Sequence, residues 1–253
     1  MRVLGLDIGS RSVDAVWLSD GVLLASAVAD SGFDPAAAAR AFVERDEHDA
    51  IVATGYGRHT AREAFGAEVV TEIRAYAVGC SALFGEPSSV LDIGGQDTKV
   101  IALGRAGRVV DFEMNDKCAA GTGKFLEVMA RALGYSLAEL ADASLSAEES
   151  VPITSMCTVF AESEVTGLVH RGVDRSSIAR GLHESIAKRT VASLKRVGAR
   201  GPLVFAGGVA KNRAMVALIR EGFLGEVLVP EDLGTDAQIV GAYGAALCAA
   251  PMP

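Results

Sequence analysis

The chain has 253 residues, half of them hydrophobic, and its 32 acidic side chains outnumber its 24 basic ones, for a formal net charge of −8. This length is enough to bury a core in one large domain or in two smaller lobes. An acidic chain lacks the basic footprint of a nucleic-acid-binding protein, and no apolar run approaches the roughly 20 residues of a membrane span. We therefore expect neither nucleic acid nor membrane as a partner.

The first residues and the cysteines indicate the cellular compartment. Charge at Arg2 and Asp7 comes too early for a secretory signal peptide, so a cytoplasmic protein is expected. The sequence has four cysteines. In a reducing compartment, cysteines are more often free, catalytic or metal-bound than disulfide-bonded.

An internal repeat organises the chain. Leu6-Asp7-Ile8-Gly9 recurs as Leu91-Asp92-Ile93-Gly94, each time at the end of an apolar segment with the pattern of a strand. After each copy the sequence predicts a turn, a second strand, a glycine turn and a third strand. The second strands are expected over 13–18 and 99–103, and the third strands over 22–28 and 109–113. Two β-meanders of the same layout predict a duplicated lobe.

Helices fill most of the remaining sequence, so the fold class is α/β. Asp34 and Pro35 form an N-cap and a first-turn residue for a helix over 35–45. Gly134 ends the amphipathic pattern that begins at Gly123. Further helices are expected over 159–171, 178–197, 213–220 and 237–250, and short strands over 49–53 and 203–206.

A lobe boundary is expected at Pro87-Ser88-Ser89. It separates an N-terminal lobe, residues 1–87, from a C-terminal lobe, residues 88–253. The last helix, 237–250, is expected to pack back on the first lobe.

The two repeated turns have the residues of a phosphate-binding site. In Asp7-Ile8-Gly9-Ser10 and in Asp92-Ile93-Gly94-Gly95-Gln96-Asp97, a carboxylate ends a strand and glycines let main-chain N–H groups approach a phosphate. Such a carboxylate can hold Mg²⁺ through water or orient an attacking water. One Asp-x-Gly alone is an ordinary β-turn, but the duplication favours a nucleotide clamped between facing turns. Neither turn has the dinucleotide-binding or the Walker P-loop spacing.

A third glycine motif, Gly207-Gly208-Val209-Ala210-Lys211-Asn212, follows a predicted strand and precedes a helix. A glycine pair at this place admits a flat ring or a ribose against the backbone. A plain strand-to-helix turn is the alternative interpretation.

Two cysteines occupy similar positions. Cys118 lies five residues before the helix expected at Gly123, and Cys157 directly precedes another helix. Helix N-termini favour the thiolate, the form that binds metal. Two cysteines do not complete a Cys₄ iron–sulfur cluster, so if both are ligands, a second copy of the chain must bring the other two. Buried structural cysteines are the alternative, and we favour that alternative for Cys80 and Cys248.

Several motifs make the chain similar to a known family. They are DIGGQDTK (92–99), NDKCAAGTGKF (115–125), CTVFAESEV (157–165) and GGVAKN (207–212), with TGYGR (54–58) and QIVGAYGAAL (238–247) in support. They resemble the BadF/BadG/BcrA/BcrD-type ATPase family, which includes activators of 2-hydroxyglutaryl-CoA and other 2-hydroxyacyl-CoA dehydratases. The resemblance extends over nearly the whole chain.

The resemblance implies a duplicated actin/hexokinase/Hsp70-like (ASKHA, ribonuclease H-like) fold with a nucleotide cleft between two ATPase lobes. It implies a homodimer with one 4Fe–4S cluster, held by Cys118 and Cys157 of each subunit. It also implies ATP hydrolysis that drives one-electron transfer to a 2-hydroxyacyl-CoA dehydratase or a related reductase component. Reduced ferredoxin or flavodoxin is the implied electron source.

The same resemblance gives roles to individual residues. Asp7 and Asp92 are expected to hold Mg²⁺ or its waters, and Gln96 or Asp97 to position the hydrolytic water. The family usually has Lys at the position of Asp14, and Arg11 is the candidate to supply that positive charge. The expected ATP- or ADP-contacting residues are Gly9, Ser10, Arg11, Gly94, Gly95, Gly121, Thr122, Gly123, Glu162, Gly207, Gly208, Lys211 and Asn212.

Three other functions are open to this sequence. A small-molecule kinase of the same fold predicts a substrate pocket and no need for Cys118. A non-redox nucleotide switch or filament protein predicts a colourless protein that tolerates loss of both cysteines. A third keeps the redox chemistry and changes the partner, for example to an aromatic acyl-CoA reductase.

Overall fold

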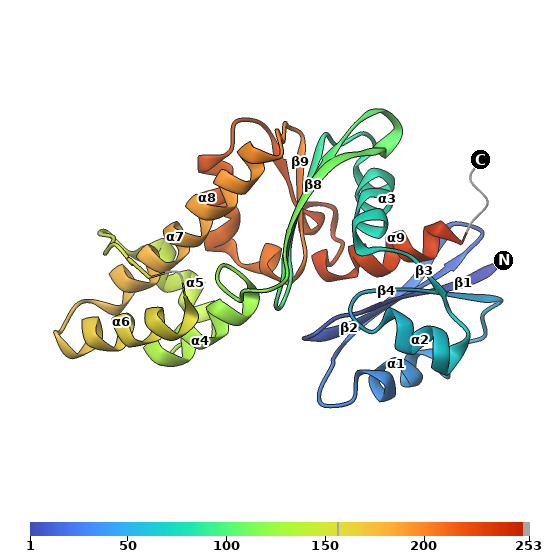
Figure 1. The fold of residues 1–253 in the computed structure, drawn as a ribbon, viewed down its shortest axis with the longest axis horizontal. Helices are drawn as coiled ribbons and strands as arrows, with labels where there is room; N and C mark the ends of the chain where they lie inside the picture. Colours follow the sequence, from blue (N-terminus) through green and yellow to red (C-terminus); the bar gives the residue numbers. More distant parts are fainter. Residues whose placement is uncertain (156, 250–253) are drawn as a thin grey trace.

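Two sheets of the same topology form the framework of the computed structural model, which describes residues 1–155 and 157–249 (Figure 1). Within those residues the strand orders are β3-β2-β1-β4-β5 and β10-β9-β6-β7-β8. In each sheet a three-stranded antiparallel meander pairs through its first strand with a later, parallel strand. The strands are β1 (Arg2–Ile8), β2 (Ser12–Ser19), β3 (Val22–Asp30), β4 (Ala50–Thr54), β5 (Glu68–Val69), β6 (Ser89–Ile93), β7 (Thr98–Leu103), β8 (Val109–Asn115), β9 (Leu203–Ala206) and β10 (Val227–Leu228). The duplicated α/β fold predicted from the repeat is confirmed.

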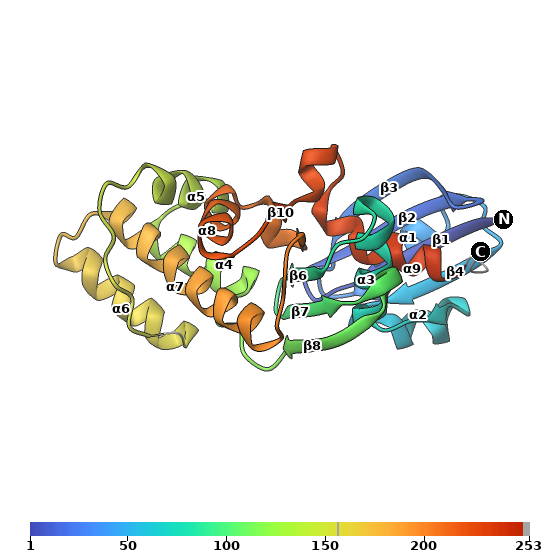
Figure 2. The ribbon, with the colours of Figure 1, turned by 90° about the horizontal axis from the view of Figure 1, so that it is seen from above.

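The helices cover both sheets and build a layer beyond the second one (Figures 1 and 2). They are α1 (Pro35–Val43), α2 (Arg58–Phe65), α3 (Glu72–Phe84), α4 (Gly123–Leu133), α5 (Leu137–Ser146), α6 (Thr158–His170), α7 (Arg175–Arg196), α8 (Arg213–Gly222) and α9 (Val240–Cys248). Short 3₁₀ turns lie at η1 (Arg105–Gly107), η2 (Gly208–Lys211), η3 (Pro230–Leu233) and η4 (Ala237–Ile239). No helix in the two described segments has the length and apolarity needed to cross a membrane.

Helices α3 and α9 lie between the two sheets. One face of this pair packs on Val3, Val16 and Val52 of the first sheet, and the other on Val90 and Val204 of the second. Both contacts bury apolar side chains, and this burial is what holds the sheets in a fixed relation. The division into lobes at residues 87 and 88 stays a proposal, since α3 and α9 each contact both sheets.

The contact between α3 and α9 is close because glycines face it. A Cβ built on Gly244 of α9 would overlap the carbonyl oxygen of Ala75 in α3. A Cβ on Gly5 of β1 would likewise overlap the carbonyl oxygen of Ala242. The small residues of the sequence over 238–247 therefore set the distance between the two sheets.

The outer layers complete two cores. Helices α1 and α2 cover the other face of the first sheet, where Trp17 meets Phe42 edge-to-face with ring centroids 5.9 Å apart. Helices α4 to α8 form the second, larger core with the second sheet, around Phe125, Phe205 and Ile178. This larger core carries both cysteine motifs, and Figure 2 shows its helices extending away from the two sheets.

Several helix boundaries differ from the sequence expectations for local reasons. Asp34 accepts a hydrogen bond from the Ala37 N–H at 3.0 Å, which confirms the predicted cap of α1, but the helix ends at Val43. Helix α7 begins three residues earlier than expected because Asp174 caps it. The last helix begins with the 3₁₀ turn η4, and its expected end at 250 lies outside the described residues.

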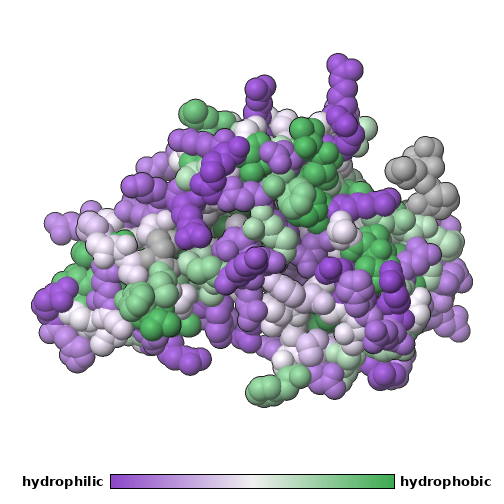
Figure 3. Space-filling view, in the orientation of Figure 1, coloured by the Kyte–Doolittle hydropathy of each residue, from purple (hydrophilic) through white to green (hydrophobic). Residues whose placement is uncertain are grey.

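One exposed apolar surface lies on the edge strand β8. Val110, Phe112 and Met114 occupy alternate positions of this strand and are all exposed. Figure 3 shows apolar side chains gathered over this part of the second sheet. Ile101, the cross-strand partner of Phe112, belongs to the core against α3. This exposed apolar surface therefore lies on the same face of the second sheet as α3, in the part that α3 leaves uncovered.

Candidate nucleotide cleft and cysteine loops

A cavity of about 500 Å³ lies where the two sheets meet. Its walls include the two repeated turns, the Gly207-Gly208 segment and the first turns of α4 and α5. The sequence-predicted residues that line it are Asp7, Gly9, Ser10, Arg11, Asp92, Gly94, Gly95, Asp97, Gly123, Gly207, Gly208, Lys211 and Asn212. Residues from both halves of the chain, from Asp7 to Asn212, thus face one space.

The two repeated turns have the same hydrogen bonding. The Gly9 N–H donates to the Ser12 carbonyl at 2.9 Å, and the Gly94 N–H donates to the Asp97 carbonyl at 3.0 Å. In the first turn, the Ser31 hydroxyl also donates to the Gly9 carbonyl at 2.8 Å. Both turns are therefore fixed by the backbone before any ligand binds.

A glycine with positive φ covers each repeated aspartate. Gly55, after β4, has a φ of +84°, and a Cβ there would overlap Asp7. Gly207, after β9, has a φ of +83°, and a Cβ there would overlap Asp92. Each aspartate thus lies beneath the backbone that leaves the neighbouring parallel strand, and only glycine fits both the φ and the space.

Lys99 is the centre of a buried ion network at the floor of the cleft. Its ammonium Nζ lies 2.9 Å from Asp92 Oδ2, 2.6 Å from Asp97 Oδ2 and 2.9 Å from Glu72 Oε2. Burial alone would lower the pKa of Lys99, but the three carboxylates raise it well above its usual value. Burial raises the pKa of Asp92 to about 6, against the opposing effect of Lys99.

The first sheet places carboxylates without a cation at the corresponding place. Burial raises the pKa of Asp14 to about 7. Burial, and then the charge of Asp14, raise the pKa of Asp7 well above its usual value. Among the described residues, Asp14 Oδ1 and Asp92 Oδ1 are buried without a hydrogen-bond partner. Both oxygens are available to a cation or to its waters.

The charge of the cleft matches a nucleotide that arrives with a metal ion. Among the described lining residues, seven carboxylates face four cationic side chains. No three His, Cys, Asp or Glu side chains of the described chain are close enough to hold a metal ion by themselves. Mg²⁺ suits such a site, because it keeps several waters and takes further oxygens from substrate phosphates.

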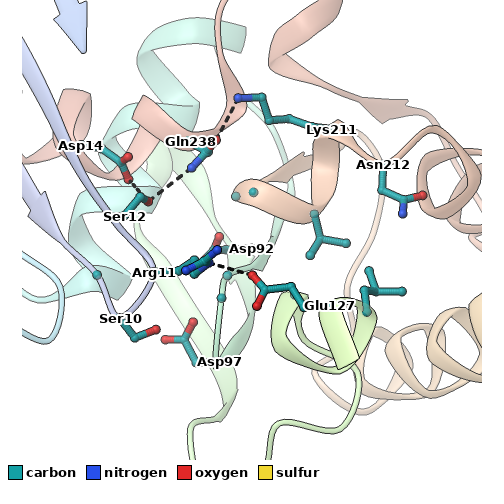
Figure 4. A pocket seen from close by; sticks show the side chains of 18 of the residues that line it. Ser10, Arg11, Ser12, Asp14, Asp92, Asp97, Glu127, Lys211, Asn212 and Gln238 are labelled. Carbon is teal, nitrogen blue, oxygen red and sulfur yellow. Dashed lines mark hydrogen bonds and ion pairs between the residues drawn. The ribbon is translucent and has the colours of Figure 1, made fainter. Parts of the chain in front are cut away.

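Two polar connections cross the cleft (Figure 4). In one, Arg11 of the first turn pairs with Glu127 of α4, Nε to Oε1, at 2.7 Å. The other is a chain of hydrogen bonds that begins at Lys211 and ends at Asp14. In order, its members are Lys211, Gln238, Ser12 and Asp14, joined at 2.8, 3.2 and 3.2 Å. These side chains therefore connect the first phosphate turn and β2 to α4 and to the Gly207-Gly208 segment across the cleft.

The end of the cleft near Gly207-Gly208 is more apolar. Leu126, Leu137 and Ala141 line it together with the glycine pair. Asn212, at the same end, uses its side chain in the fold: Oδ1 accepts from the Met215 N–H at 3.0 Å, and Nδ2 lies 3.1 Å from His183 Nε2. An apolar slot beside glycines suits the flat face of a base.

Four of the residues predicted from sequence do not line the cleft. Gln96 is exposed in the second turn, and Glu162 is exposed on α6. Gly121, with a φ of +83°, and Thr122 are buried in the loop before α4, where the Thr122 hydroxyl donates to the Ala119 carbonyl. Gly121 and Thr122 shape the cysteine loop, and only the adjoining Gly123 reaches the cavity.

Both candidate cluster cysteines are exposed. Cys118 lies in the loop between β8 and α4, where the Asn115 Nδ2 donates to its carbonyl at 2.9 Å. Cys157 is the N-cap residue of α6. By contrast, Cys80 is fully buried in α3, and Cys248 is half-buried. Two accessible thiols per chain fit the donor set of a cluster shared between two copies, since four cysteines are needed.

The cleft and the Cys118 loop are joined by the main chain. The Gly123 N–H donates to the Gly94 carbonyl at 2.9 Å, and the Lys124 N–H donates to the Gly95 carbonyl at 2.8 Å. These are the first two residues of α4, and Cys118 is five residues before them. Any shift of the second phosphate turn therefore moves the start of α4.

Several residues of the cleft had no role predicted from the sequence. They are Glu72, Tyr76, Lys99, Glu127 and Gln238. Lys99 could have been predicted from the sequence, because the antiparallel pairing of the first two strands of the meander places it opposite Asp92. The others come from helices or turns whose approach to the cleft no local pattern indicates.

Comparison with known proteins identifies the family. Residues 4–249 match the model of the BadF/BadG/BcrA/BcrD ATPase family. The chain belongs to this family. The predicted resemblance is thereby confirmed over nearly the whole sequence.

Two of the named relatives are dehydratase activators. The chain is 38% identical to the 2-hydroxyisocaproyl-CoA dehydratase activator of Clostridioides difficile, over 98% of this chain and 95% of the relative. It is 40% identical to the activator of lactoyl-CoA dehydratase of Anaerotignum propionicum, over 98% and 97%. The cleft described above therefore belongs to a member of an ATPase family that includes dehydratase activators.

Solved structures confirm the fold. The 2-hydroxyisocaproyl-CoA dehydratase activator from Clostridium difficile with bound ADPNP matches with a TM-score of 0.87 at 37% identity, over 98% of this chain and 94% of that one. A ROK family glucokinase from Streptomyces griseus matches with a TM-score of 0.56 at 15% identity, over 98% and 99%. The second likeness shows the fold alone, and together they confirm the predicted actin/hexokinase-like architecture.

Proposed function

We propose that this protein hydrolyses ATP to drive one-electron transfer to a 2-hydroxyacyl-CoA dehydratase or a related acyl-CoA reductase. Membership of an ATPase family of dehydratase activators supports both the ATPase and the class of partner. The relative with bound ADPNP supports a nucleotide in the cleft. Reduced ferredoxin or flavodoxin is the proposed electron source.

The observation that carries this proposal is the direct connection between the cleft and a cysteine loop. Two main-chain hydrogen bonds join the Gly94-Gly95 turn to the start of α4, next to the loop that holds the exposed Cys118. A kinase has no use for an exposed cysteine at this place. A protein that couples ATP hydrolysis to electron transfer needs such a connection between its nucleotide site and its redox site.

In the cleft, we assign phosphate binding to the main chain of the Gly9-Ser10 and Gly94-Gly95 turns. Asp7 and Asp92 are the residues that would hold Mg²⁺ or its waters, and the metal would neutralise phosphate charge. Of the two candidates for orienting water, Asp97 lines the cavity and Gln96 does not, which favours Asp97. Gly207, Gly208 and Lys211 are assigned to the adenosine end.

Outside the cleft, Cys118 and Cys157 are the residues that would hold a 4Fe–4S cluster, with the same pair from a second subunit. Such a cluster, when bound, supplies a one-electron carrier of low potential. Loss of the γ-phosphate would release the phosphate turns, as in other nucleotide switches. Through its bonds to Gly94 and Gly95, α4 would carry that change to the Cys118 loop.

The test is anaerobic purification of three proteins: the wild type, Cys118→Ser and Cys248→Ser. Iron and sulfide are counted per dimer, and visible spectra are recorded. We expect about four irons per wild-type dimer, as for one 4Fe–4S cluster. Cys118→Ser is expected to lose the iron, and Cys248→Ser, the matched control at a half-buried cysteine, to retain it.

A wild-type protein that stays colourless after anaerobic reconstitution contradicts the proposal. Such a result would instead fit a kinase or a nucleotide switch of the same fold. If both variants retain iron, the cluster is held by other residues, and the assignment of Cys118 is wrong.

A further inference from the structure

The ion pair between Arg11 and Glu127 spans the mouth of the cleft. Arg11 belongs to the first phosphate turn, and Glu127 lies on α4, in the half of the molecule built on the second sheet. The guanidinium Nε is 2.7 Å from Glu127 Oε1, and the guanidinium NH1 is 3.2 Å from Asp30 Oδ2. Figure 4 shows the pair as a dashed line, with the side chains of Ser10 and Asp97 below it in this view.

Arg11 lies where the two phosphate turns approach each other. A Cβ built on Gly95 would be 2.7 Å from Arg11 Cβ and 3.4 Å from Ser10 Oγ. A phosphate held by both turns would therefore be next to Arg11. Arginine is well suited to such a contact, since its planar guanidinium binds phosphate through two N–H groups.

The cationic side chains of the described cleft are all paired in this structure. Lys99 is buried among three carboxylates, and the other two basic residues besides Arg11 lie away from the turns. These two are Lys211, paired with Asp236 at 2.7 Å, and Arg213, paired with Asp142. Among the cavity-lining residues, Arg11, with 59% of its side chain exposed, is thus the cation beside the turns that can change partner. Lys124, outside the cavity, pairs with the other carboxylate oxygen of Glu127, Oε2, at 3.3 Å.

We propose that Glu127 is a built-in competitor of the terminal phosphate of ATP: it holds Arg11 until that phosphate takes its place. The inference rests on the nucleotide-binding function proposed above. It makes Glu127 a residue that sets the preference for a nucleoside triphosphate over a diphosphate. Exchange of partners also frees α4 from the first phosphate turn.

The exchange would act on the same helix as the main-chain bonds. Glu127 is the fifth residue of α4, and the first two residues of that helix bond to Gly94 and Gly95. Without nucleotide, α4 is therefore connected to both phosphate turns. With a triphosphate, its side-chain connection to the first turn is lost and its main-chain connection to the second is kept.

Titration calorimetry with Mg²⁺ and either ADPNP or ADP tests the proposal on the full-length protein. Glu127→Gln removes the competitor, so we expect ADPNP to bind about two- to fivefold more tightly, as suits a partly exposed ion pair, with ADP unchanged. Arg11→Gln removes the phosphate partner, so ADPNP is expected to bind about tenfold more weakly. The matched control, Asp232→Asn, frees Arg220 from an exposed pair outside the cleft and is expected to leave both affinities unchanged.

A double variant separates partner exchange from simple repulsion between Glu127 and phosphate. If Glu127 acts through Arg11, Glu127→Gln has no effect on ADPNP binding in the Arg11→Gln background. If the gain persists in that background, or if Glu127→Gln alone gives no gain, the proposal is overturned. If the wild type binds neither nucleotide, the proposed function itself fails.

Discussion

Asp7 and Asp14 are direct cross-strand partners on β1 and β2, and both carboxylates are buried in the wall of the cleft. At the equivalent place in the second sheet, the partner of Asp92 is Lys99. The repeat thus places two like charges in one half and an ion pair in the other. Like charges directly opposite each other destabilise a sheet, so the first half depends on a proton or a bound cation.

The first prediction is a pH dependence of stability that Asp14 causes. Burial raises its pKa from 3.8 to about 7. Since the folded protein binds this proton more tightly than the unfolded chain does, the contribution is fully present below pH 3.8 and is lost as the pH rises to about 7. We expect the stabilisation of the nucleotide-free protein by Asp14→Asn to be about 1 kcal/mol larger at pH 8 than at pH 5.5, where part of the contribution remains.

Urea unfolding in EDTA at these two pH values measures the difference. A gain of the same size at both values would show that Asp14 is not protonated in the folded state. EDTA is needed because a bound cation would replace the proton.

The second prediction concerns the buried network of Lys99. Lys99→Met leaves the carboxylates of Glu72, Asp92 and Asp97 together without their cation, and we expect a loss of about 3–5 kcal/mol in unfolding free energy at pH 7.5. Lys188→Met, at an exposed position of α7, is the control and is expected to change little. Part of the loss should be recovered at pH 5.5, where Asp92, whose pKa burial raises to about 6, takes up a proton. An unchanged midpoint in urea would show that the network contributes no stability.

The third prediction separates two costs at glycines with positive φ. Gly207 and Gly234 both have positive φ, but a Cβ at Gly207 would also overlap Asp92, whereas one at Gly234 meets open space. We expect Gly234→Ala to cost about 1 kcal/mol and Gly207→Ala roughly 3 kcal/mol. Gly207→Ala should also weaken nucleotide binding, because it displaces Asp92. Equal costs for the two variants in thermal or urea unfolding would argue against the overlap.

The fourth prediction concerns the helix pair between the sheets. In Gly244→Ala, the new methyl group would overlap the carbonyl oxygen of Ala75, and we expect a loss of about 3 kcal/mol from overpacking. Gly167→Ala, at a partly exposed position of α6, has room for the methyl group and is expected to gain up to about 1 kcal/mol from helix propensity. If Gly244→Ala is as stable as the wild type in urea, α3 and α9 can move apart without cost.

The repeat made much of the fold predictable. Two copies of Leu-Asp-Ile-Gly fixed where each meander begins, and Gly134 fixed the end of α4. Helix α3 was missed because it is buried on both sides by the sheets, so it has no polar face to give a helical period. Helix α5 was also missed, although Ser136 and Glu139 form a capping box that is legible in the sequence.

The residues of the candidate site that lie in turns could be predicted from the sequence. Aspartates and glycines at the strand ends were found because the turn chemistry itself is local. Glu127 was not found, because it reaches the cleft only through the packing of α4 against the second sheet. Asn212 was predicted to contact the nucleotide because it belongs to the Gly207-Gly208 motif. In the structure its side chain caps helix α8, a role that an asparagine at this position of the motif can also fill.

The joint between the second phosphate turn and α4 uses main-chain atoms only. Most substitutions at Lys124 would change an exposed side chain and leave both hydrogen bonds in place. Among the natural residues only proline lacks a main-chain N–H, so Lys124→Pro would remove one of the two donors and weaken this connection while sparing the residues proposed to touch phosphate.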